Sequence, residues 1–255
     1  MLFNLECGFK TKIFKFETDR SRNIKAKEEK IRRQKRFRRC HSLDSWPSPF
    51  GMRVRIALDL KGIKYEYKEE NLLEQKNPLL VESNPVYKKV PVLIHKGRPI
   101  CESLIIIQYI DAIWKDRFPL MPSDPYQQAQ ARLWAEFVEK KLYDWGKMIW
   151  MNKGEEQEKA TVEFIESLKL LEEKLGEKPS FGGETMGFLD VTLVSHYSWF
   201  YAYEKCGQFS IEAECPILLQ WAKRRMEIDS VSKSIADQEK IYEFALAVKK
   251  TMGLE

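Results

Sequence analysis

The chain has 255 residues, of which 43 are Lys or Arg, 38 are Asp or Glu and 44% are hydrophobic, enough to build one large domain or two modest ones with a proper core. No apolar run approaches the ~20 residues that a membrane-spanning helix needs, and the first residues lack the pattern of a signal peptide. Five widely spread cysteines and three histidines argue against a disulfide scaffold and against a zinc site. We therefore expect a cytoplasmic protein with reduced thiols and no metal.

The net charge of +5 conceals an uneven distribution along the chain. Residues 1–42 hold fourteen basic and five acidic residues, and the rest of the chain holds 29 basic and 33 acidic residues. We predict a basic N-terminal extension over residues 1–42, disordered or partly helical, before a mildly acidic body. A solvated extension is the default interpretation, and contact with RNA, an acidic membrane or an import receptor is the alternative. Its four acidic residues between positions 17 and 29 argue against a transit peptide.

The segment around Ser48 predicts the start of a helix. Ser is a preferred N-cap, and Pro49 suits the first helical position. Apolar residues then recur at helical spacing until Gly62: Phe50, Val54, Ala57 and Leu58. A helix start attracts anions, so the hydroxyl of Ser48 could cap the helix or donate a hydrogen bond to a bound anion such as a thiolate. Taken alone, capping is the more common use of such a serine.

The next residues predict a small α/β unit of about seventy residues. Residues 65–70 alternate like a strand, and a short helical stretch precedes Asn84-Pro85. Val90–Ile94 reads as a strand whose proline implies an edge, a bulge or a cis bond. Lys96-Gly97 predicts a hairpin turn to a returning strand. Glu102-Ser103 then opens a helix whose apolar face ends at Trp114.

A proline-rich stretch, residues 117–125, predicts a linker, and everything after it predicts helices. Asp190 matches the third position of a capping box after Gly187, so we interpret it as a structural cap. The predicted helices are Tyr126–Asn152, Glu155–Leu175, Phe188–Lys205, Pro216–Met226 and Gln238–Thr251.

Three collinear motifs point to a known family: Trp46-Pro47-Ser48-Pro49-Phe50, Lys88-Lys89-Val90-Pro91-Val92-Leu93 and Glu102-Ser103. From about Trp46 to Glu255, the chain resembles the plant tau class of cytosolic glutathione transferases. The resemblance implies a thioredoxin-like α/β N-terminal domain over residues 43–116, a linker over 117–125 and an all-α C-terminal domain over 126–255. It also implies a cytoplasmic, homodimeric enzyme that conjugates the glutathione thiolate to hydrophobic electrophiles in detoxification and stress response. From composition and charge, we expect no metal, membrane or nucleic-acid partner.

The resemblance also implies that glutathione is a co-substrate and that the enzyme uses no separate cofactor. Six residues would have roles in binding glutathione. Ser48 resembles the catalytic serine, whose hydroxyl donates a hydrogen bond to the glutathione sulfur. Glu102 and Ser103 resemble the pair that holds the γ-glutamyl end. Val90 precedes a proline that is cis in this fold, and its backbone would pair with the cysteinyl part. The cations facing the glycine carboxylate would be Lys76 and Lys89.

The resemblance further implies a hydrophobic pocket between the two domains for the second substrate. Five residues match family positions that line it: Tyr143, Trp150, Trp199, Phe244 and Val248. Aromatic residues at helical spacing also fill ordinary helical cores, so both interpretations stay open. A pocket of this composition suits flat, apolar electrophiles.

One stretch departs from the family pattern. The fold needs a first strand before Trp46, yet residues 39–45 contain only Leu43 as a strongly apolar residue, whereas a central strand should be nearly continuous in apolar residues. We therefore predict that this strand is poor or absent. Either the chain is less stable than its relatives, or the strand is held by backbone pairing alone. This weakness favours an alternative function, a ligandin-like carrier of apolar small molecules. A thiol–disulfide enzyme is disfavoured because it needs cysteine at position 48.

Overall fold

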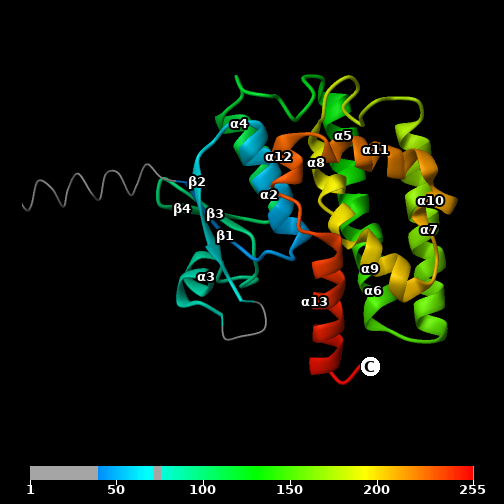
Figure 1. Cartoon of the computed structure of the whole chain (residues 1–255). Coiled ribbons are helices and arrows are strands. Elements are labelled where there is room, and N and C mark those ends of the chain that lie inside the picture. Colours follow the sequence, from blue (N-terminus) through cyan, green and yellow to red (C-terminus); the bar gives the residue numbers. More distant parts are fainter. Residues whose placement is uncertain (1–39, 72–75, 255) are drawn as a thin grey trace, which may run out of the picture.

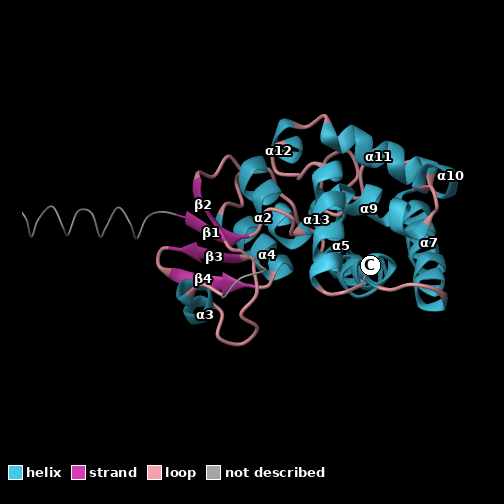
Figure 2. Ribbon diagram, turned by 60° about the horizontal axis from the view of Figure 1, so that its bottom comes forward, coloured by secondary structure: helices cyan, strands magenta, loops and turns pink. Residues whose placement is uncertain are grey.

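The computed structural model describes residues 40–71 and 76–254. They form a mixed β-sheet with three helices, packed beside a larger all-helical part (Figures 1 and 2). Residues 1–39, which contain most of the predicted basic extension, lie outside the described residues. Within the described part of the chain, none of the helices has the length and apolar character needed to cross a bilayer.

The sheet has four strands in the order β2-β1-β3-β4. β1 runs parallel to β2 and antiparallel to β3, and β3 and β4 form a hairpin. Lys96 and Gly97 both have positive φ, 53° and 76°, as a tight two-residue hairpin turn requires. The strands are β1 (Cys40–Asp44), β2 (Tyr65–Glu69), β3 (Val92–His95) and β4 (Arg98–Cys101).

Strand β1 corrects the prediction that the first strand is poor or absent. It is a central strand, paired with β2 along all five of its residues and with β3 along four. Pairing on both sides satisfies its backbone polar groups, so the strand forms although Ser42 and Asp44 are polar and fully buried. The buried carboxylate of Asp44 accepts the N–H of Ser45 at 2.7 Å and pairs with Arg55. β1 begins at Cys40, within the range that we assigned to the extension.

Three helices accompany the sheet: α2 (Pro49–Leu60), α3 (Pro78–Ser83) and α4 (Ser103–Ile113). Figure 2 shows α2 and α4 between the sheet and the helical part, and α3 on the side turned away from it. The apolar faces of α2 and α4 bury Ile56, Leu58, Ile107 and Ile110 completely. The Val90–Pro91 peptide bond is cis, as the resemblance implies.

In the helical part, three predicted helices have the predicted limits, and two others are interrupted. The predicted helix over residues 126–152 contains a π-helical segment, η1, and the predicted helix over residues 188–205 breaks at Ser195-His196. The elements are α5 (Pro125–Phe137), η1 (Val138–Tyr143), α6 (Asp144–Met151), α7 (Glu155–Leu175), α8 (Phe188–Val194), α9 (Tyr197–Gly207), α10 (Ile211–Glu214), α11 (Pro216–Met226), α12 (Asp229–Ser232) and α13 (Gln238–Thr251).

Asp190 is a structural cap, as predicted. Its buried carboxylate accepts N–H groups from Gly187 at 2.8 Å and from Phe181 and Gly182 at 2.9 Å each. It also accepts the indole N–H of Trp221 at 3.0 Å. Four donors thus hold the loop before α8, and none of them faces a cavity shared with Ser48.

Candidate active site

Ser48 stands at the N-terminus of α2, where the sequence predicts it. It is only 7% exposed, and its hydroxyl oxygen accepts the backbone N–H of Gly51 at 3.2 Å. Gly51 is required here because an added Cβ would lie 1.5 Å from a carboxylate oxygen of Asp44. No acidic residue occupies the first turn of α2, so the partial positive charge of this helix end is not neutralised locally.

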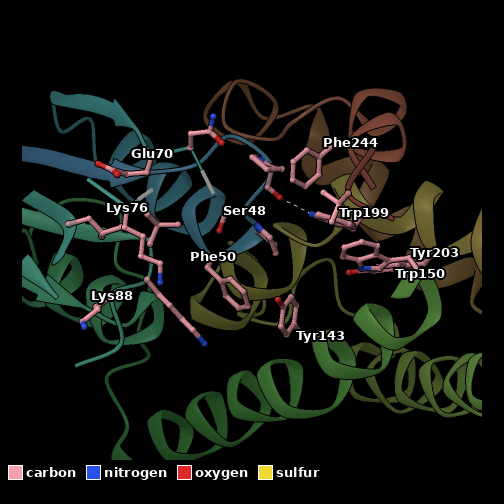
Figure 3. Close-up of a pocket in the computed structure, with 17 residues that line it drawn as sticks. Ser48, Phe50, Glu70, Lys76, Lys88, Tyr143, Trp150, Trp199, Tyr203 and Phe244 are labelled. Carbon is pink, nitrogen blue, oxygen red and sulfur yellow. Dashed lines mark hydrogen bonds between the residues drawn. The ribbon is translucent and has the colours of Figure 1, made fainter. Parts of the chain in front are cut away.

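The hydroxyl of Ser48 lines a cavity of about 380 Å³ between the two parts of the molecule. Figure 3 shows Ser48 between a side with lysine and glutamate residues and a side made of aromatic rings. Nine of the eleven predicted site residues line this cavity: Ser48, Lys76, Lys89, Val90, Tyr143, Trp150, Trp199, Phe244 and Val248.

The other two predicted residues, Glu102 and Ser103, line an adjoining cavity of about 790 Å³ that shares Phe50, Lys89, Val90 and Tyr143 with the first. Glu102 has a φ of 65°, a left-handed conformation that is uncommon outside glycine and often marks a ligand site. Ser103 is buried at the first position of α4, and no described side chain caps this helix. Its hydroxyl accepts a hydrogen bond from Arg53 at 3.2 Å.

Backbone groups of the loop before β3 also face the site. Asn84 holds this loop, because its side chain donates to the carbonyl of Lys89 at 3.0 Å and accepts the N–H of Tyr87 at 3.1 Å. Among the described residues, no backbone hydrogen bond involves Val90. Within the described residues, the backbone of Val90 is therefore without a hydrogen bond, beside two exposed lysines, Lys88 and Lys89.

The opposite wall is aromatic. The rings of Trp150 and Trp199 lie 5.4 Å apart, and Phe244 from α13 lies 6.4 Å from Trp199 and 5.5 Å from Trp46. The indole N–H of Trp199 donates to the carbonyl of Pro47 at 2.8 Å, which ties α9 to the residue before Ser48. The residues of this wall pack in or against the helical core and line the cavity as well.

Arg53 connects the two parts beneath the cavity. Its guanidinium is fully buried and donates to the hydroxyl of Ser103, to the Glu139 carboxylate and to the Thr192 carbonyl. It also lies 3.1 Å from Nε2 of His196. Burial, reinforced by the Arg53 charge, lowers the pKa of His196 well below its ordinary value, so this imidazole is neutral and can accept the Arg53 hydrogen bond.

The π-helical segment η1 contributes one residue to the contacts of Arg53 and another to the cavity. Glu139, near its start, pairs with Arg53, and Tyr143, at its end, lines both cavities. A π turn shifts the register of the helix by one residue relative to a regular α-helix and occurs frequently at functional sites. The ring of Tyr143 also packs edge-on against Phe50, with centroids 4.6 Å apart.

Sequence reasoning missed several lining residues, of which Glu70 and Tyr203 are the most notable. Glu70 follows β2 where the parallel pair β1/β2 ends, an edge at which α/β folds place ligands. Burial raises the pKa of its carboxyl group. Tyr203 lies one helical turn after Trp199, and this i, i+4 spacing is a signal that could have identified it.

Comparison with known proteins agrees with this architecture. Residues 40–112 match the family described as glutathione S-transferase, N-terminal domain. The chain is 58% identical to a probable glutathione S-transferase, parC, of Nicotiana tabacum, over 84% of this chain and 96% of the relative. It is 56% identical to glutathione S-transferase U25 of Arabidopsis thaliana, again over 84% of this chain and 96% of the relative.

Solved structures show the same relationship. The chain resembles rice GST1 (OsGSTU1), crystallised in complex with glutathione, with a TM-score of 0.80 and 46% identity over 83% of this chain and 98% of that one. It also resembles the tau-class enzyme MiGSTU from mango, with a TM-score of 0.78 and 41% identity over 82% of this chain and 98% of that one. The chain therefore belongs to the glutathione S-transferase family and, within it, to the plant tau class.

Proposed function

We propose that glutathione lies along the thioredoxin-like part with its sulfur at Ser48, and that this transferase conjugates it to hydrophobic electrophiles held by the aromatic wall. One observation carries the proposal: the hydroxyl at the start of α2 lines the same cavity as Trp150, Trp199 and Phe244. Nucleophile and electrophile would thus meet in one enclosed space, and holding them together supplies most of the acceleration.

The two functions considered for the Ser48 hydroxyl are compatible. A serine hydroxyl has one hydrogen to donate and two lone pairs to accept. Its oxygen already accepts the N–H of Gly51, so its hydrogen remains available for an anionic sulfur. Capping therefore orients the hydroxyl, and the positive end of α2 adds to the stabilisation of a thiolate.

The γ-glutamyl end would bind at the start of α4. Ser103 follows the same logic as Ser48, since its hydroxyl accepts from Arg53 and keeps its own hydrogen for a carboxylate. The uncapped end of α4 favours the same carboxylate. Glu102 suits the ammonium group, the unpaired backbone of Val90 suits the cysteinyl part, and Lys76 and Lys89 suit the glycine carboxylate.

The contribution of Ser48 to the rate has a physical limit. A free thiol is only ~3% ionised at pH 7, and a pKa lowered by ~2 units would ionise most of it. Because a less basic thiolate is also a weaker nucleophile, with a Brønsted slope near ~0.45, the net gain at neutral pH is roughly 3-fold. Ser48 would therefore set ionisation, while the helical part sets substrate range and most of the rate.

The family also supports a homodimer in the cytoplasm as the working form, with glutathione as co-substrate and no cofactor. The carrier alternative loses its main support, because it rested on a defective first strand and β1 is a fully paired central strand. Turnover of a chloronitrobenzene by the purified protein distinguishes the enzyme from a carrier, which would bind the compound without consuming glutathione.

The role of Ser48 is tested by Ser48→Ala. A hydrogen bond to a charged group contributes about 1.5–3 kcal/mol, so the midpoint of the pH profile of kcat/KM should rise by about 1–2 pH units. Ser48→Thr keeps the hydroxyl and the cap, so its midpoint should stay close to that of the wild type. An unmoved midpoint in the alanine variant would remove Ser48 from thiolate stabilisation.

A further inference from the structure

A cavity of about 420 Å³ lies in the helical part, separate from the candidate active site. It shares no lining residue with either cavity of that site. Four segments form its walls: residues 119–123 of the linker, α5, the end of α7 with the loop that follows, and the start of α8. In Figure 1 the linker and this loop lie at the end of the helical part opposite the C-terminus. The cavity has the size of a small-molecule site.

Hydrogen bonds fix the walls of this cavity. The carboxylate of Asp111 on α4 accepts the N–H groups of Leu120 and Met121 at 2.8 and 3.0 Å, which holds the linker. The carbonyl of Leu120 accepts the N–H of Phe188 at 2.8 Å, which joins the linker to α8. The carboxylate of Asp190 holds the loop after α7. A site whose walls are already fixed loses little conformational freedom when a ligand binds.

One side of the cavity is apolar and aromatic. The rings of Trp134 and Phe181 line it and are held by edge-on contacts, Trp134 with Phe137 at 5.5 Å and Phe181 with Trp221 at 5.2 Å. Both rings are only half-buried, so each keeps surface that a ligand can cover. The buried apolar residues beside them are Leu120, Met186, Phe188 and Leu189. A planar aromatic body suits such a surface.

The charge of the cavity is positive. Of the charged residues in 40–71 and 76–254, two line it, and both are lysines, Lys174 and Lys178. Neither lysine forms an ion pair with a residue in these ranges. The ammonium group of Lys174 lies 5.5 Å from the centroid of the Trp134 ring, so positive charge adjoins the aromatic surface. Lys174 also complements the C-terminal end of α7, but Lys178 lies beyond that helix and has no such role.

We propose that this cavity binds a planar aromatic compound that carries a phosphate monoester. A phosphate monoester has a charge of about −1.5 to −2 at pH 7 and three acceptor oxygens, so it matches two lysines, whereas a carboxylate would compensate only one. The aromatic body lies against Trp134 and Phe181, and the side-chain amides of Gln127 and Gln130 face its polar edge. Nucleoside monophosphates and phosphorylated phenols share this chemistry.

The test is calorimetric titration of the full chain with 1-naphthyl phosphate. We expect one molecule per chain, with the same affinity whether or not S-hexylglutathione is present to occupy the Ser48 cavity. Inorganic phosphate and 1-naphthol, which each represent half of the ligand, should bind at least ~10-fold more weakly, because each loses either the ring contact or the charge contact. Adenosine monophosphate is titrated in parallel, and whichever compound binds more tightly identifies the source of the phosphate.

Two substitutions together, Lys174→Met and Lys178→Met, remove both charges and keep the apolar stems. The Kd of 1-naphthyl phosphate should rise by ~10-fold, as the loss of two partly exposed charge pairs permits, and that of 1-naphthol should stay within about 2-fold. The matched control combines Lys115→Met with Lys159→Met. These two exposed lysines line none of the three cavities, so the control loses the same net charge and should bind as the wild type does.

A third variant tests the location without changing charge. Gln130→Trp places a ring in the cavity from the partly exposed face of α5 and should abolish binding of both 1-naphthyl phosphate and 1-naphthol. Its melting temperature checks that the fold is intact.

Three results would overturn the inference: no binding of 1-naphthyl phosphate by the wild type at ~1 mM, equal affinity in the wild type and the double lysine variant, or binding that S-hexylglutathione abolishes. None of them would affect the proposed function, because the two sites share no residue. Conjugation by all these variants should match that of the wild type, and a wild type without conjugating activity would contradict the proposed function alone.

Discussion

The thioredoxin-like part contributes the hydroxyl of Ser48, several lysines and the Val90 segment to the cavity, whereas the helical part contributes mainly aromatic rings. Hydrogen bonds within the thioredoxin-like part orient its polar groups. Examples are the bonds between Ser48 and Gly51 and between Asn84 and Lys89. The rings are oriented by packing, as in Trp199 with Trp150. Under the proposed function, the directional bonds would hold one invariant tripeptide, and the packed rings would accept many apolar shapes.

Arg53 is an exception to this separation between the two parts. It belongs to α2 yet contacts residues of both parts. Arg53→Met should destabilise the protein by about 3–5 kcal/mol, the typical result of removing one partner from a buried ion pair. Urea unfolding measures the loss. Lys140→Ala removes an exposed ion pair with Glu136 on the same helical segment and should leave the unfolding midpoint unchanged. An Arg53 variant as stable as this control would mean that the parts do not depend on the guanidinium.

The buried carboxyl group of Asp44 should make the stability of the thioredoxin-like part depend on pH. Burial raises the pKa of its carboxyl group to about 6, against the opposing effect of Arg55, from an ordinary value of 3.8. The folded state therefore holds this proton more tightly than the unfolded state does, so its stabilising effect is full below pH ~4 and is lost as pH rises through ~6. A shift of this size corresponds to a contribution on the order of a few kcal/mol.

The measurement is urea unfolding at several pH values between 4 and 7 for the wild type and Asp44→Asn. The wild type should lose stability relative to the variant across this interval. The opposite slope would mean that the Arg55 ion pair outweighs burial at this carboxylate.

Two substitutions, one on each wall of the cavity, test whether the two walls bind different substrates. Phe244→Ala should raise KM for an aromatic electrophile by about 10-fold, the equivalent of ~1.4 kcal/mol of lost apolar contact, and leave KM for glutathione unchanged. Lys89→Ala should raise KM for glutathione by about 3-fold, as loss of one exposed charge pair permits, and leave KM for the electrophile unchanged. If either variant altered both constants equally, the walls would not act separately.

Much of the fold follows from local patterns. Glu155–Leu175, Pro216–Met226 and Gln238–Thr251 have strong helical periodicity and clear ends, and the structure gives the same limits. Strand β1 was misjudged because hydropathy registers side chains, whereas Ser42 and Asp44 are accommodated by backbone pairing and by Arg55. The π turn at Val138–Tyr143 and the break at Ser195-His196 leave no mark in the hydrophobic periodicity. Each contains a residue that contacts Arg53, Glu139 in the first and His196 in the second.

Some residues of the candidate site could likewise be predicted from the sequence, and others could not. The motif residues around Ser48, Val90 and Glu102 could be located because a resemblance fixed their positions, although their roles toward glutathione stay predictions. Glu70 and Tyr203 were missed because no motif contains them, and only the assembled cavity shows that they face it.

The hydrogen bond from the Trp199 indole to the Pro47 carbonyl, 2.8 Å long, has a mechanical consequence. It fastens the helical part to the residue before Ser48, so the crevice cannot widen at this corner without breaking a buried bond. Bulkier electrophiles must instead be admitted by rearranging side chains farther out, along α13. Diversification of substrate range would thus proceed through Phe244, Val248 and their surroundings, while the geometry around Ser48 stays constant.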